Sequence, residues 1–165
     1  MILGAIQDDK PSIADGLLVE SGRPETTRNV TRGVRRLLRA GGLAVLTEFP
    51  LSNGRRADLI ALSSDGVLRI IEIKSSSADF RADRKWVEYR AYCDRFYFAI
   101  PLGLPAQQFP SDAGLILADA HGAMLEREAP VHKLAPASRK AMLVRFGALA
   151  AERLHCAAFR DEGPP

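Results

Sequence analysis

Residues 67–74 read Val67-Leu68-Arg69-Ile70-Ile71-Glu72-Ile73-Lys74, and this stretch decides the fold. Its apolar, β-branched run predicts a β-strand with a buried centre. Side chains two residues apart on a strand point to the same face of the sheet. Glu72 and Lys74 are therefore expected side by side at the end of this strand, where a carboxylate and an ammonium group need an explanation.

A second apolar strand, upstream of the first, carries one more carboxylate. Residues 55–62 contain a core-like run that includes Asp58. Burying a charge without a partner is costly, so the two strands indicate a shared ionic site made of Asp58, Glu72 and Lys74. We favour a divalent-metal site with a lysine beside it; a partly exposed ion pair at the strand ends is the alternative.

The pattern on either side of these strands predicts a mixed β-sheet flanked by helices, an α/β fold. The order is α-β-β-β-α-β, followed by additional C-terminal strands and a helix. The predicted elements are a helix over 27–40, strands over 43–51, 55–62 and 67–74, a helix over 78–93, strands over 95–100, 114–118 and 123–128, and a helix from 136 to about 157.

Composition and charge are those of one globular domain. The chain has 165 residues, of which 47% are hydrophobic and 26% charged, which is enough to form a sizeable core. We expect a single domain over residues 26–160, a flexible arm over 1–25 and a frayed tail over 161–165. The net charge of +3 permits a polyanionic partner without requiring one.

The cysteines and the apolar runs favour a cytoplasmic location. Cys93 and Cys156 match neither a zinc spacing nor a CxxC redox motif. No apolar run reaches the length of a membrane span, and the N-terminus lacks the basic start of a signal peptide. We therefore expect a cytoplasmic protein with reduced thiols and no membrane association.

The ionic site has the donor atoms that a hard cation prefers. Mg²⁺ or Mn²⁺ takes oxygen ligands, often from only one or two carboxylates plus a substrate phosphate. Asp58, Glu72 and the backbone carbonyl of Ile73 would be a sufficient protein ligand set. Lys74 would orient or deprotonate a water molecule, or stabilise negative charge as a cation. Glu48, on the first strand, is a candidate third carboxylate or equally a solvated residue.

A row of arginines on the first helix is a candidate surface for nucleic acid. Arg28, Arg32, Arg35 and Arg39 follow helical spacing on the side opposite the apolar face. Residues 26–47 contain no acidic residue, so the sequence predicts no i, i+4 ion pairs along this row. Such a row suits contacts with phosphate groups, and a solvated helix face is the alternative.

Further candidates for phosphate contact surround the two charged strands. Arg55 and Arg56 follow Ser52-Asn53-Gly54, which predicts a hairpin turn. We expect these two arginines either to contact phosphate or simply to cap the hairpin tip. Ser75 and Ser76 follow Lys74 and most simply cap the next helix, although their hydroxyl groups could also donate to a phosphate. Lys85 and Tyr89 share a helix with Trp86 and Tyr92, whose rings we expect to pack on the sheet.

The charged motif resembles the PD-(D/E)XK nuclease superfamily. Asp58 matches the Asp of that motif, and Glu72-Ile73-Lys74 matches its second half, although Ala57 stands where the motif has Pro. The resemblance implies a restriction-endonuclease-like αβββαβ core and metal-dependent cleavage of nucleic acid. Lys85 and Tyr89 resemble the QxxxY element of RecB-like nucleases, with Lys in place of Gln.

A second resemblance covers most of the chain, from about residue 28 to residue 155. The chain is similar to the MmcB family of bacterial DNA repair proteins, which implies a nuclease-like role in the repair of DNA damage. The matching runs are Gly54-Arg55-Arg56-Ala57-Asp58, Glu72-Ile73-Lys74-Ser75-Ser76, Ala78-Asp79-Phe80-Arg81-Ala82-Asp83-Arg84-Lys85-Trp86, Tyr89-Arg90-Ala91-Tyr92-Cys93-Asp94-Arg95 and Asp112-Ala113-Gly114-Leu115-Ile116.

These observations lead to a metal-dependent DNA endonuclease or nicking enzyme, with DNA as its partner. A catalytically inactive DNA-binding or adaptor protein with the same fold is the alternative, and an RNA nuclease is a third. The sequence leaves open the preferred DNA structure, the use of one metal ion or two, the repair partners, and whether the chain forms a homodimer.

Overall fold

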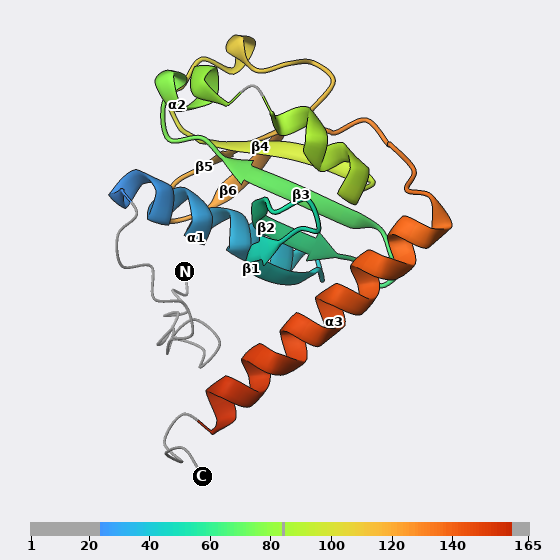
Figure 1. Ribbon diagram of the computed structural model, residues 1–165. Coiled ribbons are helices and arrows are strands. Elements are labelled where there is room, and N and C mark those ends of the chain that lie inside the picture. Colours follow the sequence, from blue (N-terminus) through green and yellow to red (C-terminus); the bar gives the residue numbers. More distant parts are fainter. Residues whose placement is uncertain (1–23, 84, 160–165) are drawn as a thin grey trace, which may run out of the picture.

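The protein is built on one mixed sheet of six strands, seen in a computed structural model that describes residues 24–83 and 85–159. The strands lie side by side in chain order, β1 to β6. β1, β2 and β3 are antiparallel neighbours, β4 and β5 continue parallel to β3, and β6 returns antiparallel. The predicted α/β fold with a mixed sheet flanked by helices is therefore confirmed (Figure 1), and it is compatible with a restriction-endonuclease-like core.

The element bounds agree with the sequence patterns to within about two residues for all strands and for both long helices. Gly54, with φ +81°, turns the chain between the first two strands, as expected for a hairpin glycine. The elements are α1 (Glu25–Ala40), β1 (Ala44–Pro50), β2 (Arg56–Leu62), β3 (Leu68–Ile73), α2 (Ser77–Ala82), the 3₁₀ helix η2 (Trp86–Tyr92), β4 (Arg95–Pro101), the 3₁₀ helix η3 (Ala106–Gln108), β5 (Gly114–Ala118), β6 (Ala123–Arg127) and α3 (Pro136–Ala158).

The helix predicted over residues 78–93 is wrong, because this segment breaks at Asp83. α2 ends at Ala82, and Asp83 takes an extended conformation with φ −95° and ψ 90°. The Asp83 carboxylate accepts a hydrogen bond from the backbone N–H of Lys85. Such a local side-chain bond to the backbone competes with helix formation, and the chain resumes as η2.

The sheet separates two hydrophobic cores. On one face, Val30, Val34 and Leu38 of α1 pack against alternate strand residues that include Ile71 and Ile73. On the other face α2, η2 and α3 pack around Phe96 and Phe98 of β4. Since side chains alternate along β3, Glu72 and Lys74 belong to the second face, with Ile70.

The carboxylate of Asp94 connects the start of β3 with the segment that leads into α3. Asp94 is 3% exposed, and its carboxylate accepts hydrogen bonds from the backbone N–H groups of Leu68 and Leu134. The Arg139 guanidinium of α3 donates to both of its oxygens. This ionic junction fixes the start of α3 against the β2–β3 turn, since Arg139 also donates to the Gly66 carbonyl.

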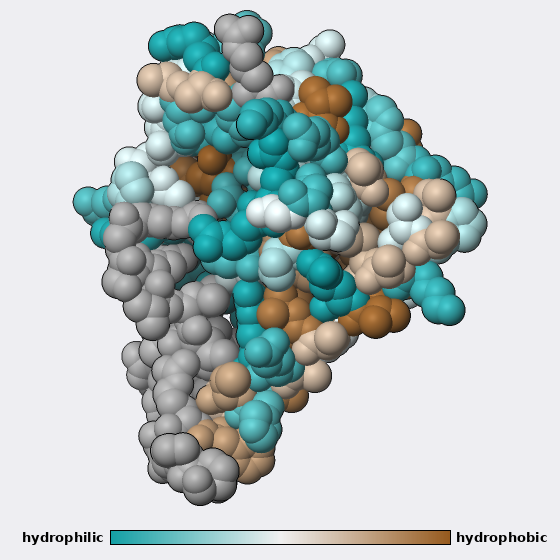
Figure 2. All heavy atoms as spheres, in the orientation of Figure 1, coloured by the Kyte–Doolittle hydropathy of each residue, from teal (hydrophilic) through white to brown (hydrophobic). Residues whose placement is uncertain are grey.

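Beyond this junction, α3 extends past the sheet (Figure 1). Figure 2 shows apolar and polar side chains intermixed along its outer side. Most of the arm expected over 1–25 and the tail expected over 161–165 fall outside the described residues, and Glu25 already belongs to α1. Within residues 24–83 and 85–159, no helix combines the length and hydropathy needed to cross a bilayer.

Candidate active site

The candidate site lies where β2 and β3 begin to part. The last backbone pair between these strands is Leu59 with Ile71. Beyond it, two side chains take over the hydrogen bonding: the Asp58 N–H donates to Glu72 Oε1 at 3.1 Å, and the Ile73 N–H donates to Asp58 Oδ2 at 2.8 Å. Each carboxylate thus binds the backbone of the other strand, which holds Asp58 and Glu72 next to each other.

Glu72 sits in an environment that opposes its charge. Its residue is 5% exposed. Burial, followed by the negative charge of Asp58, raises the pKa of the Glu72 carboxyl to about 8. Glu72 therefore carries a proton near neutral pH when no cation is bound, and a carboxyl group with so strongly raised a pKa is typical of functional sites.

Lys74 is held by a residue that the sequence patterns did not single out. Lys74 is 6% exposed, and its Nζ lies 2.7 Å from Oδ2 of Asp83. Burial opposes the charge of Asp83, but the hydrogen bond and charge of Lys74 outweigh it, so the pKa of Asp83 lies below its ordinary value. Asp83 was hidden because it lay inside a predicted continuous helix, and only the break after α2 brings it to Lys74.

The donor set fits a hard divalent cation. The Ile73 N–H points to Asp58 whereas the Lys74 N–H points to Ala99 of β4, so alternation along the strand places the Ile73 carbonyl on the Asp58 side. Among the residues that the structure describes, no group of three or more His, Cys, Asp or Glu side chains is gathered for a metal. Two carboxylates and one carbonyl remain, which is the sparse, all-oxygen set usual for Mg²⁺.

Glu48 lies across from Asp58 on β1, in an irregular part of that strand. The register runs Thr47 with Leu59 and Phe49 with Ala57, and no pair is formed between them at Glu48 and Asp58. Glu48 has φ +49°, in the left-handed region. Its carboxylate forms an ion pair with Arg56, so it flanks the site rather than joining Asp58 and Glu72 as a third ligand.

The other candidates near the site are mostly engaged within the protein. Arg55 pairs with Glu88 at 2.8 Å. Ser76 caps α2 by accepting the Asp79 N–H, and Ser75 donates to the Asp79 carboxylate.

Two candidates come from the segment that covers the site. The Lys85 side chain is exposed. Tyr89 is 6% exposed, stacks on Phe96 and donates from its hydroxyl group to the Arg56 carbonyl at 3.3 Å. Tyr89 therefore fastens η2 over the start of β2, next to Asp58, while the expected packing of Trp86 on the sheet is confirmed.

The arginines of α1 lie on the other face of the sheet from Glu72 and Lys74. Arg32 and Arg39 are exposed, whereas Arg28 and Arg35 are half-buried and have contacts within the protein. The four side chains are thus not equivalent, although all four leave the apolar face of α1 to Val30, Val34 and Leu38.

The model of one protein family, described as DNA repair protein MmcB-like, matches residues 14–161 of this chain. The chain belongs to the MmcB-like family of DNA repair proteins. No curated protein matches it.

A solved structure supports the fold of this MmcB-like protein. It is a protein of unknown function from Silicibacter pomeroyi, 42% identical in sequence, with a TM-score of 0.79. The match covers 86% of the present chain and 97% of the other. At this level of identity the two proteins share the fold over nearly their whole described length, and the neighbour adds no activity.

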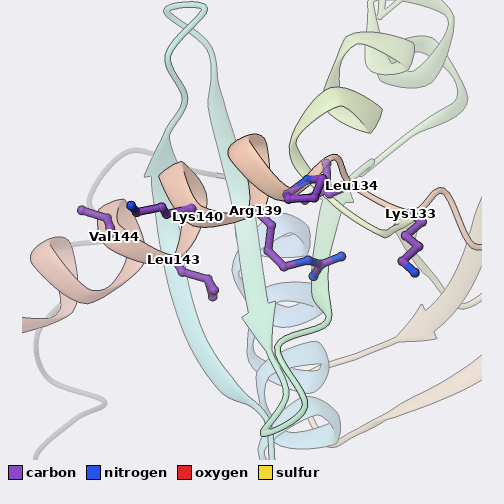
Figure 3. Close-up of a pocket in the computed structure, with 7 residues that line it drawn as sticks. Lys133, Leu134, Arg139, Lys140, Leu143 and Val144 are labelled. Carbon is purple, nitrogen blue, oxygen red and sulfur yellow. The ribbon is translucent and has the colours of Figure 1, made fainter.

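A surface hollow of the MmcB-like protein lies away from the carboxylates. It borders the start of α3 and is lined by Lys133, Leu134, Pro136, Arg139, Lys140, Leu143 and Val144 (Figure 3). Arg139 binds the turn that precedes β3, whereas Glu72 and Lys74 lie at the far end of β3. The hollow is therefore at the opposite end of the strands from the candidate site.

Proposed function

We propose that this MmcB-like protein is a metal-dependent DNA endonuclease or nicking enzyme that hydrolyses phosphodiester bonds during DNA repair. The observation that carries the proposal is the pairing of Asp58 and Glu72 by reciprocal hydrogen bonds, with the buried Lys74 on the same face of β3. The order of helices and strands and the Asp58, Glu72-Ile73-Lys74 pattern support membership of the PD-(D/E)XK nuclease superfamily.

Asp58, Glu72 and the Ile73 carbonyl would hold Mg²⁺ or Mn²⁺. Such a cation would supply Lewis-acid stabilisation of the negative charge that develops on the phosphate. Glu72 would give up its proton before it serves as a ligand, because its carboxyl group is protonated at neutral pH in the cation-free protein.

Lys74 would act as a cation rather than as a base. Its Nζ is engaged in an ion pair with the Asp83 carboxylate, which leaves it no role in taking a proton from water. An ammonium group two residues from Glu72 on the same face is placed to stabilise a phosphate whose negative charge increases during the reaction. Asp83 would set the position of this ammonium group.

DNA would approach from the α2 and η2 side, the face of the sheet on which the buried Glu72 and Lys74 side chains lie. The exposed Lys85 lies on that side. Because α1 covers the opposite face, a substrate that also contacts Arg32 or Arg39 must pass around the end of the sheet. Phosphate contacts at these arginines would add affinity without sequence preference.

The decisive experiment is a cleavage panel on single-stranded, duplex, nicked, flapped and branched DNA, with and without Mg²⁺ or Mn²⁺. The proposal expects cleavage or nicking of at least one substrate with the metal, and loss of it in Asp58→Ala. Glu126→Gln, an exposed carboxylate on β6, is the matched control and should cleave like wild type. Metal-independent cleavage, or full activity in Asp58→Ala, would refute the site.

A non-catalytic DNA-binding adaptor is the second candidate function. It is favoured by the engagement of Lys74 with Asp83 and by the limited carboxylate set among the described residues. An adaptor should bind branched or damaged DNA equally with and without Mg²⁺, and Asp58→Ala should bind like wild type. Absence of cleavage on the whole panel, together with metal-independent binding, would select this function.

A further inference from the structure

Strand β1 is distorted beside the candidate site, at Glu48. A φ of +49° is the left-handed region, which a residue with a side chain adopts at a cost. Glu48 is the only non-glycine residue with positive φ among those that the structure describes. Backbone strain of this kind persists only where the surroundings hold it in place, and it gathers at functional sites.

The group that holds this distortion comes from α3. Arg153 Nη1 donates to the Thr47 carbonyl at 2.7 Å, and Arg153 Nη2 donates to the Glu48 carbonyl at 3.2 Å. In a regular strand, successive carbonyl groups point to opposite edges. One guanidinium can reach both only because the backbone is irregular at Glu48, so the Arg153 contact and the left-handed residue require each other.

The distortion has a direct consequence for the site. The strand pairs on either side of Glu48 are kept, but Glu48 and Asp58 form none. On the β1 side, Asp58 therefore has no backbone pair. On the β3 side, its carboxylate accepts the Ile73 N–H and so continues the pairing of the two strands. The same irregular backbone directs the Glu48 carboxylate to Arg56.

We propose that Arg153 is a positioning residue for the Asp58 and Glu72 centre. By binding two consecutive carbonyls of β1, it holds Glu48 in its left-handed conformation and so fixes β1 beside Asp58. The catalytic part of this inference rests on the proposed function, whereas its structural part does not. This contact also gives the projecting α3 helix a role, since only Met142 and Phe146 of that helix are buried.

The same helix offers a matched control. Arg145 donates to the Pro50 carbonyl at 2.8 Å, so it also joins α3 to β1, whereas Arg153 is the donor to the Thr47 and Glu48 carbonyls. Arg153→Met and Arg145→Met both remove a guanidinium and keep an apolar stem. A general loss of α3 docking would affect both variants, and loss of positioning would affect only the first.

The first measurement is Mn²⁺ binding by titration calorimetry. It is followed by kcat and KM on the DNA substrate that the wild-type protein cleaves. We expect Arg153→Met to lose roughly tenfold or more in Mn²⁺ affinity and kcat, as supporting residues of metal sites do. KM for DNA should stay close to wild type, Arg153→Lys should recover part of the loss, and Arg145→Met should match wild type. Unchanged Mn²⁺ affinity in Arg153→Met, or equal losses in both Met variants, would overturn the inference.

The second measurement does not depend on activity. Glycine adopts positive φ without strain, so Glu48→Gly should reduce the need for Arg153. In a double-mutant cycle read by urea unfolding, Arg153→Met should destabilise the wild-type background more than the Glu48→Gly background. Equal effects in the two backgrounds would overturn the inference. If no variant and no wild-type protein cleaves DNA, the proposed function fails while this cycle still decides the role of Arg153.

Discussion

Glu72→Gln should make the cation-free protein more stable at alkaline pH. The Glu72 carboxyl group is buried beside Asp58, and its pKa is raised from 4.5 to about 8. In that range the folded protein binds a proton that the unfolded chain does not. The resulting stabilisation is complete below pH 4.5 and is lost as the pH rises through about 8. A glutamine mimics the protonated carboxyl group and carries no such dependence.

The size of the effect follows from the shift of the pKa. Each unit corresponds to about 1.4 kcal/mol, so a shift from 4.5 to about 8 is worth at most about 5 kcal/mol. The amide oxygen introduced by Glu72→Gln can still accept the Asp58 N–H that Glu72 Oε1 accepts now. We therefore expect the variant to gain several kcal/mol over wild type at pH 9, and little at pH 5.

The assay is urea unfolding of EDTA-treated protein from pH 5 to pH 9, with Glu126→Gln as a control for removal of an exposed carboxylate. The control should follow the wild-type curve. A difference between Glu72→Gln and wild type that stays constant over this range would refute the reasoning, and so would a variant that loses stability at pH 9.

The remaining predictions concern the supports of the site and of the fold. Asp83→Asn leaves the buried Lys74 ammonium without its carboxylate, and since Asp83 is partly exposed we expect a loss of about 1–3 kcal/mol in urea unfolding. Asp94→Asn should cost about 3 kcal/mol at pH 7. Although burial opposes the charge of Asp94, the Arg139 guanidinium and two backbone N–H groups keep the pKa of Asp94 below its ordinary 3.8. The stabilisation is therefore present above pH 3.8 and is lost as the pH falls through the pKa of the folded protein. The stability of Asp94→Asn should approach that of wild type in acid. Gly33→Ala places a Cβ 2.3 Å from two carbonyl oxygens of the β5–β6 turn and should lower Tm, whereas Gly147→Ala, with open space on α3, should raise stability by about 0.5–1 kcal/mol.

The sheet could be predicted because its signals are local. Apolar runs of strand length, the Ser52-Asn53-Gly54 turn and the Gly41-Gly42 helix end each act over a few residues. The closeness of Asp58 and Glu72 also followed from the sequence, since a short hairpin connection between two strands leaves few possible registers.

What the sequence did not predict depends on contacts between distant segments. The break at Asp83 comes with a local bond to the Lys85 N–H and with an ion pair to Lys74, which lies nine residues earlier, directly after β3. The left-handed Glu48 depends on Arg153, which is 105 residues away in the chain. The helical pattern around Asp83 does not indicate its contact with Lys74, and the strand pattern around Glu48 does not indicate its contact with Arg153.

The position of the arginine row relative to the candidate site also could not be predicted from the local sequence. Helical spacing placed Arg28, Arg32, Arg35 and Arg39 away from the core, which is where they lie. The spacing gave no information about which face of the sheet α1 would cover. That face is opposite Glu72 and Lys74, which is a property of the whole fold.

The central claim is that Asp58 and Glu72 together bind a divalent cation, and Mn²⁺ tests it most directly. Crystals soaked in MnCl₂ should give an anomalous difference peak between the two carboxylates, next to the Ile73 carbonyl, and Glu72→Gln crystals should lack it. A protein that cleaves DNA with Mn²⁺ but shows no peak there, or shows its peak elsewhere, would contradict the account.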